Sequence, residues 1–169
     1  MSHKTRTAVV AGTLLIIALA LGLYSWLAKK PTVSSMEPEP GRIHVYVDGH
    51  FSANVNPEQV SALSPASFVD PEKGKTQKGP WLKDIVLLYV PEKQLRSDSI
   101  ITVIGTESGQ GPGKKASLTW DQIKDPDNHI LFDFSTSGDS VKLVGTSPEL
   151  DTRSKWVQGD QRIDVTTRP

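Results

Sequence analysis

The chain has no cysteine. This absence excludes disulfide bonds, thiolate nucleophiles, zinc–thiolate sites, covalently attached c-type haem and a lipidated cysteine. It does not identify the redox compartment, because a domain large enough to bury its own core needs no disulfides. Catalysis or metal binding would therefore depend on other side chains.

An excess of charge of either sign is also missing. The 169 residues include 19 basic and 19 acidic side chains, so the composition does not indicate a nucleic-acid-binding surface, and we expect no nucleic acid partner. Once a hydrophobic segment and a linker at the N-terminus are set aside, the remaining length is enough for one domain with one core.

One long hydrophobic run is present, from Thr7 to Ala28. It contains 22 residues without a charge, and as a helix it would span the roughly 30 Å of a bilayer core. The run predicts a single transmembrane helix that acts as a signal anchor. A cleavable signal peptide is the alternative, because Lys4 and Arg6 form a basic head, although the run is longer than the apolar region of most signal peptides.

The segments around this helix predict the organisation of the chain. Residues 1–6 form a cytoplasmic head. Residues 29–41, KKPTVSSMEPEPG, contain three prolines and too few large apolar groups to fold, so they form an extended linker. Residues 42–169 then form an extracytoplasmic domain, in the periplasm or outside the cell, of a single-pass protein of the cell membrane.

The first half of this domain begins with a predicted hairpin. Residues 43–47 alternate between apolar and polar side chains, and Asp48 and Gly49 follow as a two-residue turn. A short helix follows, with Asn56 as its N-cap and Pro57 as its first residue.

The next segment, residues 65–79, is polar and rich in proline and glycine, so we expect a surface loop. A second helix is predicted over residues 80–90, starting at Pro80. Its apolar face comprises two rows, one of Trp81, Ile85 and Leu88 and one of Leu82, Val86 and Tyr89.

The second half is dominated by predicted strands. Residues 99–104 form an apolar run, which is typical of a strand buried on both faces. Residues 115–119 resume extended character, and Thr119 with Gln122 has the pattern of a capping box that starts a short helix. Four further short strands are expected between residues 128 and 166. This mixture predicts an α+β domain with a mixed, mainly antiparallel sheet and short helices.

A glycine-rich stretch, GTESGQGPGKK at residues 105–115, raises the question of nucleotide binding. A phosphate-binding loop needs a glycine where Ser108 stands and a serine or threonine where Lys115 stands, followed by a helix. A dinucleotide-binding loop would need a glycine at Lys114. The stretch is therefore interpreted as a hairpin loop, and no nucleotide is expected.

Two histidines, His44 and His50, are the candidates for a metal site. On one continuous strand they would share a face with Asp48, and imidazoles with a carboxylate can bind zinc or iron. A turn at Asp48 and Gly49 would separate them. The simpler interpretation is the solvated side of an edge strand, and no metal ligand is predicted.

Other side chains give no catalytic pattern. No nucleophile elbow is present. Asp125 and Asp127 surround a proline, where aspartate is typical of a turn. Three lysines of residues 65–79 could attract an anionic partner, although neighbouring acids dilute them: Lys73, Lys75 and Lys78. We predict no catalytic residue, and the cofactor-binding residues are unknown.

In their order along the chain, these segments resemble the molybdopterin-binding domain of the sulfite oxidase superfamily. The stretches that carry the resemblance are RIHVYVDGHF, VNPEQVSAL, GPWLKDIVLL, SIITVIGT, KKASLTWDQI, NHILFDF and KWVQGDQRIDV. They cover nearly all of residues 42–166. The positions that match the family pattern are Gly79, Leu82, Asp84, Lys155, Trp156, Val157, Arg162 and Ile163.

The resemblance implies a scaffold without its redox centre. Family enzymes bind molybdenum through a cysteine in the segment that corresponds to residues 67–79, and this chain has no cysteine. It therefore implies a membrane-anchored, non-catalytic binding or assembly module without a cofactor, whose partner would be another protein. The alternative is an oxidoreductase, or a subunit of one beside a redox subunit, that binds molybdopterin without cysteine ligation.

Overall fold

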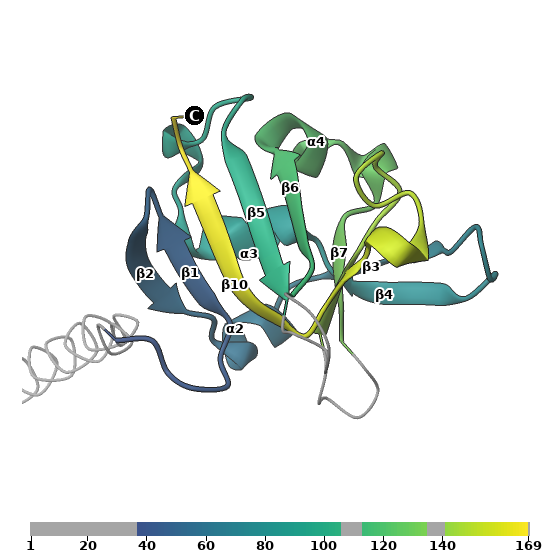
Figure 1. Ribbon diagram of the computed structural model, residues 1–169, viewed down its shortest axis with the longest axis horizontal. Helices are drawn as coiled ribbons and strands as arrows, with labels where there is room; N and C mark the ends of the chain where they lie inside the picture. Colours follow the sequence, from purple (N-terminus) through teal and green to yellow (C-terminus); the bar gives the residue numbers. More distant parts are fainter. Residues whose placement is uncertain (1–36, 106–112, 135–140, 169) are drawn as a thin grey trace, which may run out of the picture. The chain divides into compact units, whose positions relative to one another are not determined.

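A mixed five-stranded sheet forms the centre of the domain (Figure 1). The order of its strands is β2 (His50–Asn54), β1 (His44–Val47), β10 (Asp160–Thr166), β5 (Ile100–Gly105) and β6 (Lys115–Thr119). Strands β1 and β10 are parallel, and the other neighbours are antiparallel. The prediction of an α+β domain with a mainly antiparallel sheet is therefore confirmed.

The computed structural model describes residues 37–105, 113–134 and 141–168, which belong to one compact unit. The expected transmembrane segment Thr7–Ala28 lies outside these residues. Within them, no helix is long and apolar enough to cross a membrane.

Two smaller sheets lie beside the first. Strands β3 (Pro65–Val69) and β4 (Thr76–Pro80) form a hairpin, and β7 (Leu131–Phe134), β8 (Val141–Val144) and β9 (Val157–Gln158) form an antiparallel sheet. Trp81 and Leu131 form a bridge that joins the end of β4 to β7. Gly79 lies so close to β7 that a Cβ atom there would overlap the carbonyl oxygen of Phe132.

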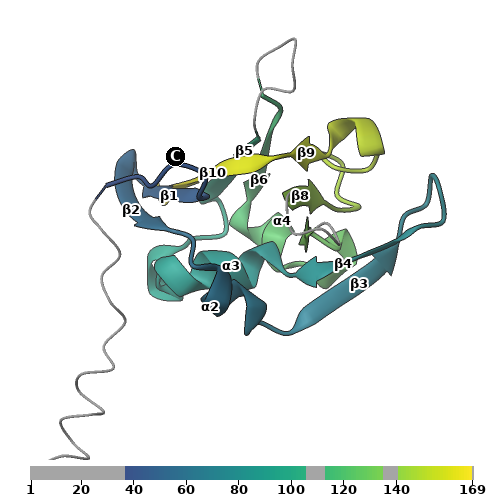
Figure 2. The ribbon, with the colours of Figure 1, turned by 90° about the horizontal axis from the view of Figure 1, so that it is seen from below.

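Short helices complete the described fold. They are α2 (Pro57–Ser61), α3 (Leu82–Tyr89) and α4 (Trp120–Lys124), with single 3-10 turns η1 (Glu92–Gln94), η2 (Pro126–Asn128) and η3 (Arg153–Lys155). Figure 2 shows α2 and α3 on one side of the five-stranded sheet. The core on this side comprises Val45, Leu82, Ile85, Val86, Ile101, Val103, Leu118, Ile163 and Val165.

Local sequence signals located two elements correctly. Asp48 and Gly49 form the turn between β1 and β2, with φ angles of 49° and 81°; such positive values are required at both central residues of a type I′ hairpin turn. The side chain of Thr119 caps α4 at the backbone N–H of Gln122, whose own side chain returns to Thr119. The predicted capping box is confirmed.

The prediction of a surface loop over residues 65–79 is wrong, because these residues form the β3–β4 hairpin. Pro71 and Gly74 lie at the tip, whereas Pro65 and Gly79 lie within the paired arms. The second helix begins at Leu82 rather than Pro80, because Pro80 still pairs with Pro65 in the hairpin. Of the face predicted for this helix, Leu82, Ile85 and Val86 are buried as expected, whereas Leu88 is 38% exposed.

Strand β5 is buried on one face, not on both. Ile101 and Val103 are buried, whereas Ile100, Thr102 and Ile104 are half-buried. Antiparallel sheets commonly leave one face to solvent, and the outer face of this sheet carries no helix in the described part of the chain (Figure 1).

Residues at the end of the expected linker contact the domain. The Asn54 side chain donates to the carbonyl oxygen of Glu37 (3.1 Å) and accepts from the backbone N–H of Glu39 (3.1 Å). The chain therefore passes Asn54, at the end of β2, and continues through Gly41 and Arg42 into β1.

Candidate binding groove

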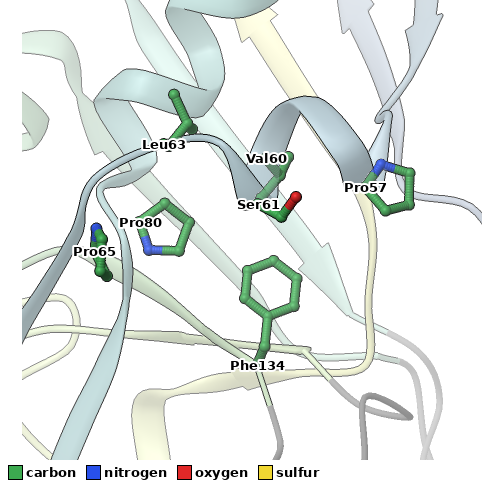
Figure 3. A pocket seen from close by; sticks show the side chains of 7 residues that line it. All are labelled: Pro57, Val60, Ser61, Leu63, Pro65, Pro80 and Phe134. Atoms are coloured by element: carbon green, nitrogen blue, oxygen red, sulfur yellow. The ribbon is translucent and has the colours of Figure 1, made fainter.

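An apolar hollow of about 340 Å³ lies between α2, the open end of the β3–β4 hairpin and the end of β7 (Figure 3). Figure 3 shows the Phe134 ring facing α2 across the hollow. The lining is almost entirely apolar, and prolines supply three of its members. The lining residues are Pro57, Val60, Ser61, Leu63, Pro65, Pro80 and Phe134.

A second hollow, of about 220 Å³, adjoins the first. The two share Pro57, Val60 and Phe134 as common walls, and the second continues to the point where the chain enters the domain. Its other lining residues are Gly41, Arg42, Ile43, Val55 and Val141. Together the hollows form one surface, which we call the Phe134 groove.

Phe134 and its neighbour on the same face of β7 differ in burial. Phe132 and Phe134 lie two residues apart on β7 and therefore on one face. Phe132 is fully buried, whereas Phe134 is 38% exposed. The groove is thus the place where the apolar face of β7 emerges from the core.

Helix α2 forms the opposite wall, and its position is fixed at its first residues. Asn56 accepts a hydrogen bond from the backbone N–H of Glu58 (2.9 Å), and Pro57 supplies a preset φ at the first helical position. The backbone N–H of Asn56 donates to the hydroxyl of Tyr89 on α3 (2.8 Å). Tyr89 thereby joins the start of α2 to α3, and burial raises the pKa of its hydroxyl.

The segment where the family resemblance would place a metal ligand, residues 67–79, belongs to the β3–β4 hairpin. Its inward side chains Phe68, Asp70 and Gln77 are buried. Arg153 on η3 holds the tip from the other side: its Nη1 lies 3.4 Å from Asp70 Oδ2, and its backbone N–H donates to Glu72 Oε1 (2.8 Å). The space beneath the hairpin holds these buried side chains.

A histidine that the sequence did not single out helps to fill it. The ring of His129 packs against Phe68 (5.5 Å between centroids) and Trp81 (6.3 Å). Its Nδ1 lies 2.8 Å from the carbonyl oxygen of Asp127, so Nδ1 carries the proton. His129 has a φ of 45°, which is uncommon for a residue with a side chain, and no local sequence signal predicts this arrangement.

The structure does not bring the histidines His44 and His50 together. His50 pairs with Val47 beside the turn, whereas His44 pairs with Asn54 at the far end of the hairpin. The Nε2 of His44 donates to the carbonyl oxygen of Glu39 (2.8 Å). Among the described residues, no three metal-binding side chains cluster.

The remaining candidates have local structural roles. Asp125 accepts a hydrogen bond from the backbone N–H of Asp127 (3.0 Å), so this pair forms the expected turn. Residues 106–112 of the glycine-rich stretch lie outside the described residues. Strands β5 and β6, which flank it, pair as the predicted hairpin, and a strand rather than a helix follows it.

No protein-family model matches the chain, and no curated protein sequence matches it either. The interpretation of the groove therefore depends on its own geometry. The sequence contains one signal for it that the prediction did not use, namely two phenylalanines at strand spacing in ILFDF. The other lining residues come from distant parts of the chain.

Proposed function

We propose that this protein is a membrane-anchored, extracytoplasmic binding module that holds a partner protein in the Phe134 groove and performs no catalysis itself. The observation that carries the proposal is the exposed Phe134 ring between two adjoining apolar hollows. Covering a large apolar side chain is worth about 1.5–3 kcal/mol when it is fully buried. Aromatic side chains in pockets are typical anchors of protein interfaces.

The fold proposed for this module is the molybdopterin-binding scaffold of the sulfite oxidase superfamily. Its support is the order of the elements: a glycine-turn hairpin, a short helix, the segment ending at Gly79, the helix with Leu82 and Asp84, and a last strand that contains Arg162 and Ile163. The scaffold alone does not define an activity.

The residues present do not fit a molybdenum cofactor of the kind that this family binds. The segment that carries the ligating cysteine in family enzymes is here the β3–β4 hairpin, and its inward face is packed with Phe68, Asp70 and Gln77. The chain offers no thiolate. This closed hairpin supports the non-catalytic part of the proposal.

Site-specific photo-crosslinking in membranes of the native host tests the proposal. The full-length protein carries a photo-crosslinking amino acid at Ser61, which lines the groove, or at Ser67 on the exposed side of the hairpin. We expect a discrete protein adduct from position 61 only. Phe134→Asp should remove the adduct, whereas Leu87→Asp should keep it, because Leu87 is equally exposed but lies on α3 outside the groove.

Two results would contradict the proposal. One is an adduct from position 61 that is unchanged by Phe134→Asp, since the groove would then not hold the partner. The other is stoichiometric molybdenum or pterin in the protein purified from its native host, which would favour the oxidoreductase alternative.

A further inference from the structure

We infer that the occupant of the Phe134 groove is an extended segment of a partner protein that contains proline between two large apolar side chains and a basic residue beside them. This inference rests on the proposed function and specifies the chemistry of the partner. Three features of the groove carry it: its two hollows, the scarcity of hydrogen-bonding side chains in the first hollow and its acidic edge.

The two hollows indicate two apolar anchors that are close in sequence. A cavity of about 150 Å³ accommodates a benzene-sized group, and the hollows measure about 340 and 220 Å³. Each has room for at least one large side chain. Because Pro57, Val60 and Phe134 wall both hollows, the two anchors must lie on either side of this shared wall.

The scarcity of polar groups in the groove favours an occupant with few unpaired backbone donors. Among the side chains lining the first hollow, Ser61 is the polar one, and its hydroxyl already donates to the carbonyl oxygen of Glu58 (2.9 Å). A backbone N–H left without a partner in a buried interface destabilises the complex. Proline has no N–H, and extended proline-rich segments bind aromatic-lined grooves.

The edge of the groove is acidic. Glu58 lies one helical turn before Ser61 on α2, is exposed, and makes no ion pair within the described residues. Glu37 and Glu39 precede Gly41 and Arg42, and Arg42 lies 3.7 Å from Glu39. Because Arg42 pairs with Glu39, the other two carboxylates of this edge within the described residues, Glu37 and Glu58, favour a lysine or arginine in the partner, which would mainly set specificity and association rate.

The same charge argues against an anionic lipid surface as the occupant, because such membranes attract basic rather than acidic segments. A neutral lipid would satisfy the apolar hollows but would leave the acidic edge without a counterpart. The partner segment described above satisfies both.

Selection from a phage-displayed library of random short peptides tests the inference. The full-length protein in detergent micelles serves as bait, with counter-selection against the Phe134→Asp variant. We expect recovered peptides to share a proline between two large apolar residues, with lysine or arginine beside them. In fluorescence anisotropy, changing that basic residue to glutamate should weaken binding about two- to fivefold. The Glu58→Lys variant should bind the glutamate peptide more tightly than the basic peptide. The distant Glu92→Lys variant should still bind the basic peptide more tightly.

Several outcomes would overturn the inference. They are recovered peptides without a basic residue or without proline, no enrichment at all, and binding of phosphatidylcholine vesicles or self-association that Phe134→Asp abolishes. The photo-crosslinking result separates the two proposals. If the adduct at position 61 depends on Phe134 but the peptides lack this pattern, the binding function stands and the inferred partner is wrong. If the adduct does not depend on Phe134, both fail.

Discussion

Arg153 Nη1 lies 3.4 Å from Oδ2 of Asp70, a carboxylate that is 1% exposed. This ion pair joins the tip of the β3–β4 hairpin to η3, 83 residues further along the chain. Within the described residues, neither of the two facing atoms has a hydrogen bond. The charge of each is therefore balanced by the other.

Arg153→Ala should lower the free energy of unfolding by on the order of 2 kcal/mol. The substitution leaves the buried carboxylate of Asp70 without a counter-charge. Breaking a fully buried ion pair costs about 3–5 kcal/mol, and the loss here should be smaller because Arg153 is partly exposed. Urea denaturation measures the loss. Arg96→Ala, which removes the exposed pair with Asp98, is the control and should cost less than about 1 kcal/mol. Equal losses in the two variants would contradict this role.

Gly79→Ala should destabilise the protein by about 3 kcal/mol or more. Its Cβ would overlap the carbonyl oxygen of Phe132, and backbone cannot move aside as a flexible side chain can. The control is Gly74→Ala at the hairpin tip. Gly74 has a φ of 62° and open space around it, so alanine there should cost only about 1–2 kcal/mol of backbone strain. Thermal and urea unfolding compare the two, and a smaller loss at Gly79 than at Gly74 would contradict the close approach.

Asp48→Asn should destabilise the protein near neutral pH and have less effect in acid. Hydrogen bonds from the backbone N–H of Thr167 (2.8 Å) and from its hydroxyl (2.7 Å) lower the pKa of the Asp48 carboxyl below its ordinary value of 3.8. A carboxyl whose pKa is lowered by folding stabilises the fold above its unfolded pKa and loses that contribution as pH falls through the folded pKa.

The measurement is thermal unfolding of the wild type and the Asp48→Asn variant as a function of pH. The two melting temperatures should differ above about pH 5 and converge below pH 3.8. Asparagine tolerates the positive φ of this turn position, so backbone strain does not confound the comparison. A difference that stays constant across the range would contradict the prediction.

Phe134→Ala and Phe132→Ala should differ strongly in stability although both lie on one face of β7. Phe132 is fully buried, so its truncation should cost about 3–5 kcal/mol. Phe134 is 38% exposed and should cost clearly less. Urea denaturation checks this difference. Similar losses would mean that Phe134 belongs to the core rather than to a binding groove.

The parts of the fold that the sequence predicts well depend on neighbouring residues. Asp48 and Gly49 define their turn by backbone preference alone, and Thr119 with Gln122 defines a helix start through two bonds within four residues. Such signals need no knowledge of the remaining chain. The short strands after residue 128 follow from the same kind of local pattern.

The features that the sequence did not predict depend on contacts between residues far apart in the chain. Residues 65–79 contain breakers typical of a loop, but Phe68 pairs with Gln77, and the hairpin is held by His129 and Arg153 from elsewhere in the chain. The run over residues 99–104 does not reveal that one of its faces stays open. The groove combines residues between 41 and 141, so no window of sequence contains it.

The position of β10 has a consequence for how the domain is made. Strand β10, the last of the described strands, lies between β1 and β5 and runs parallel to β1. The β1–β2 and β5–β6 hairpins can each form early, but the sheet stays in two halves until β10 inserts between them. A polypeptide still emerging during synthesis therefore cannot complete this sheet, and it exposes the apolar faces of both halves until residues 160–166 arrive.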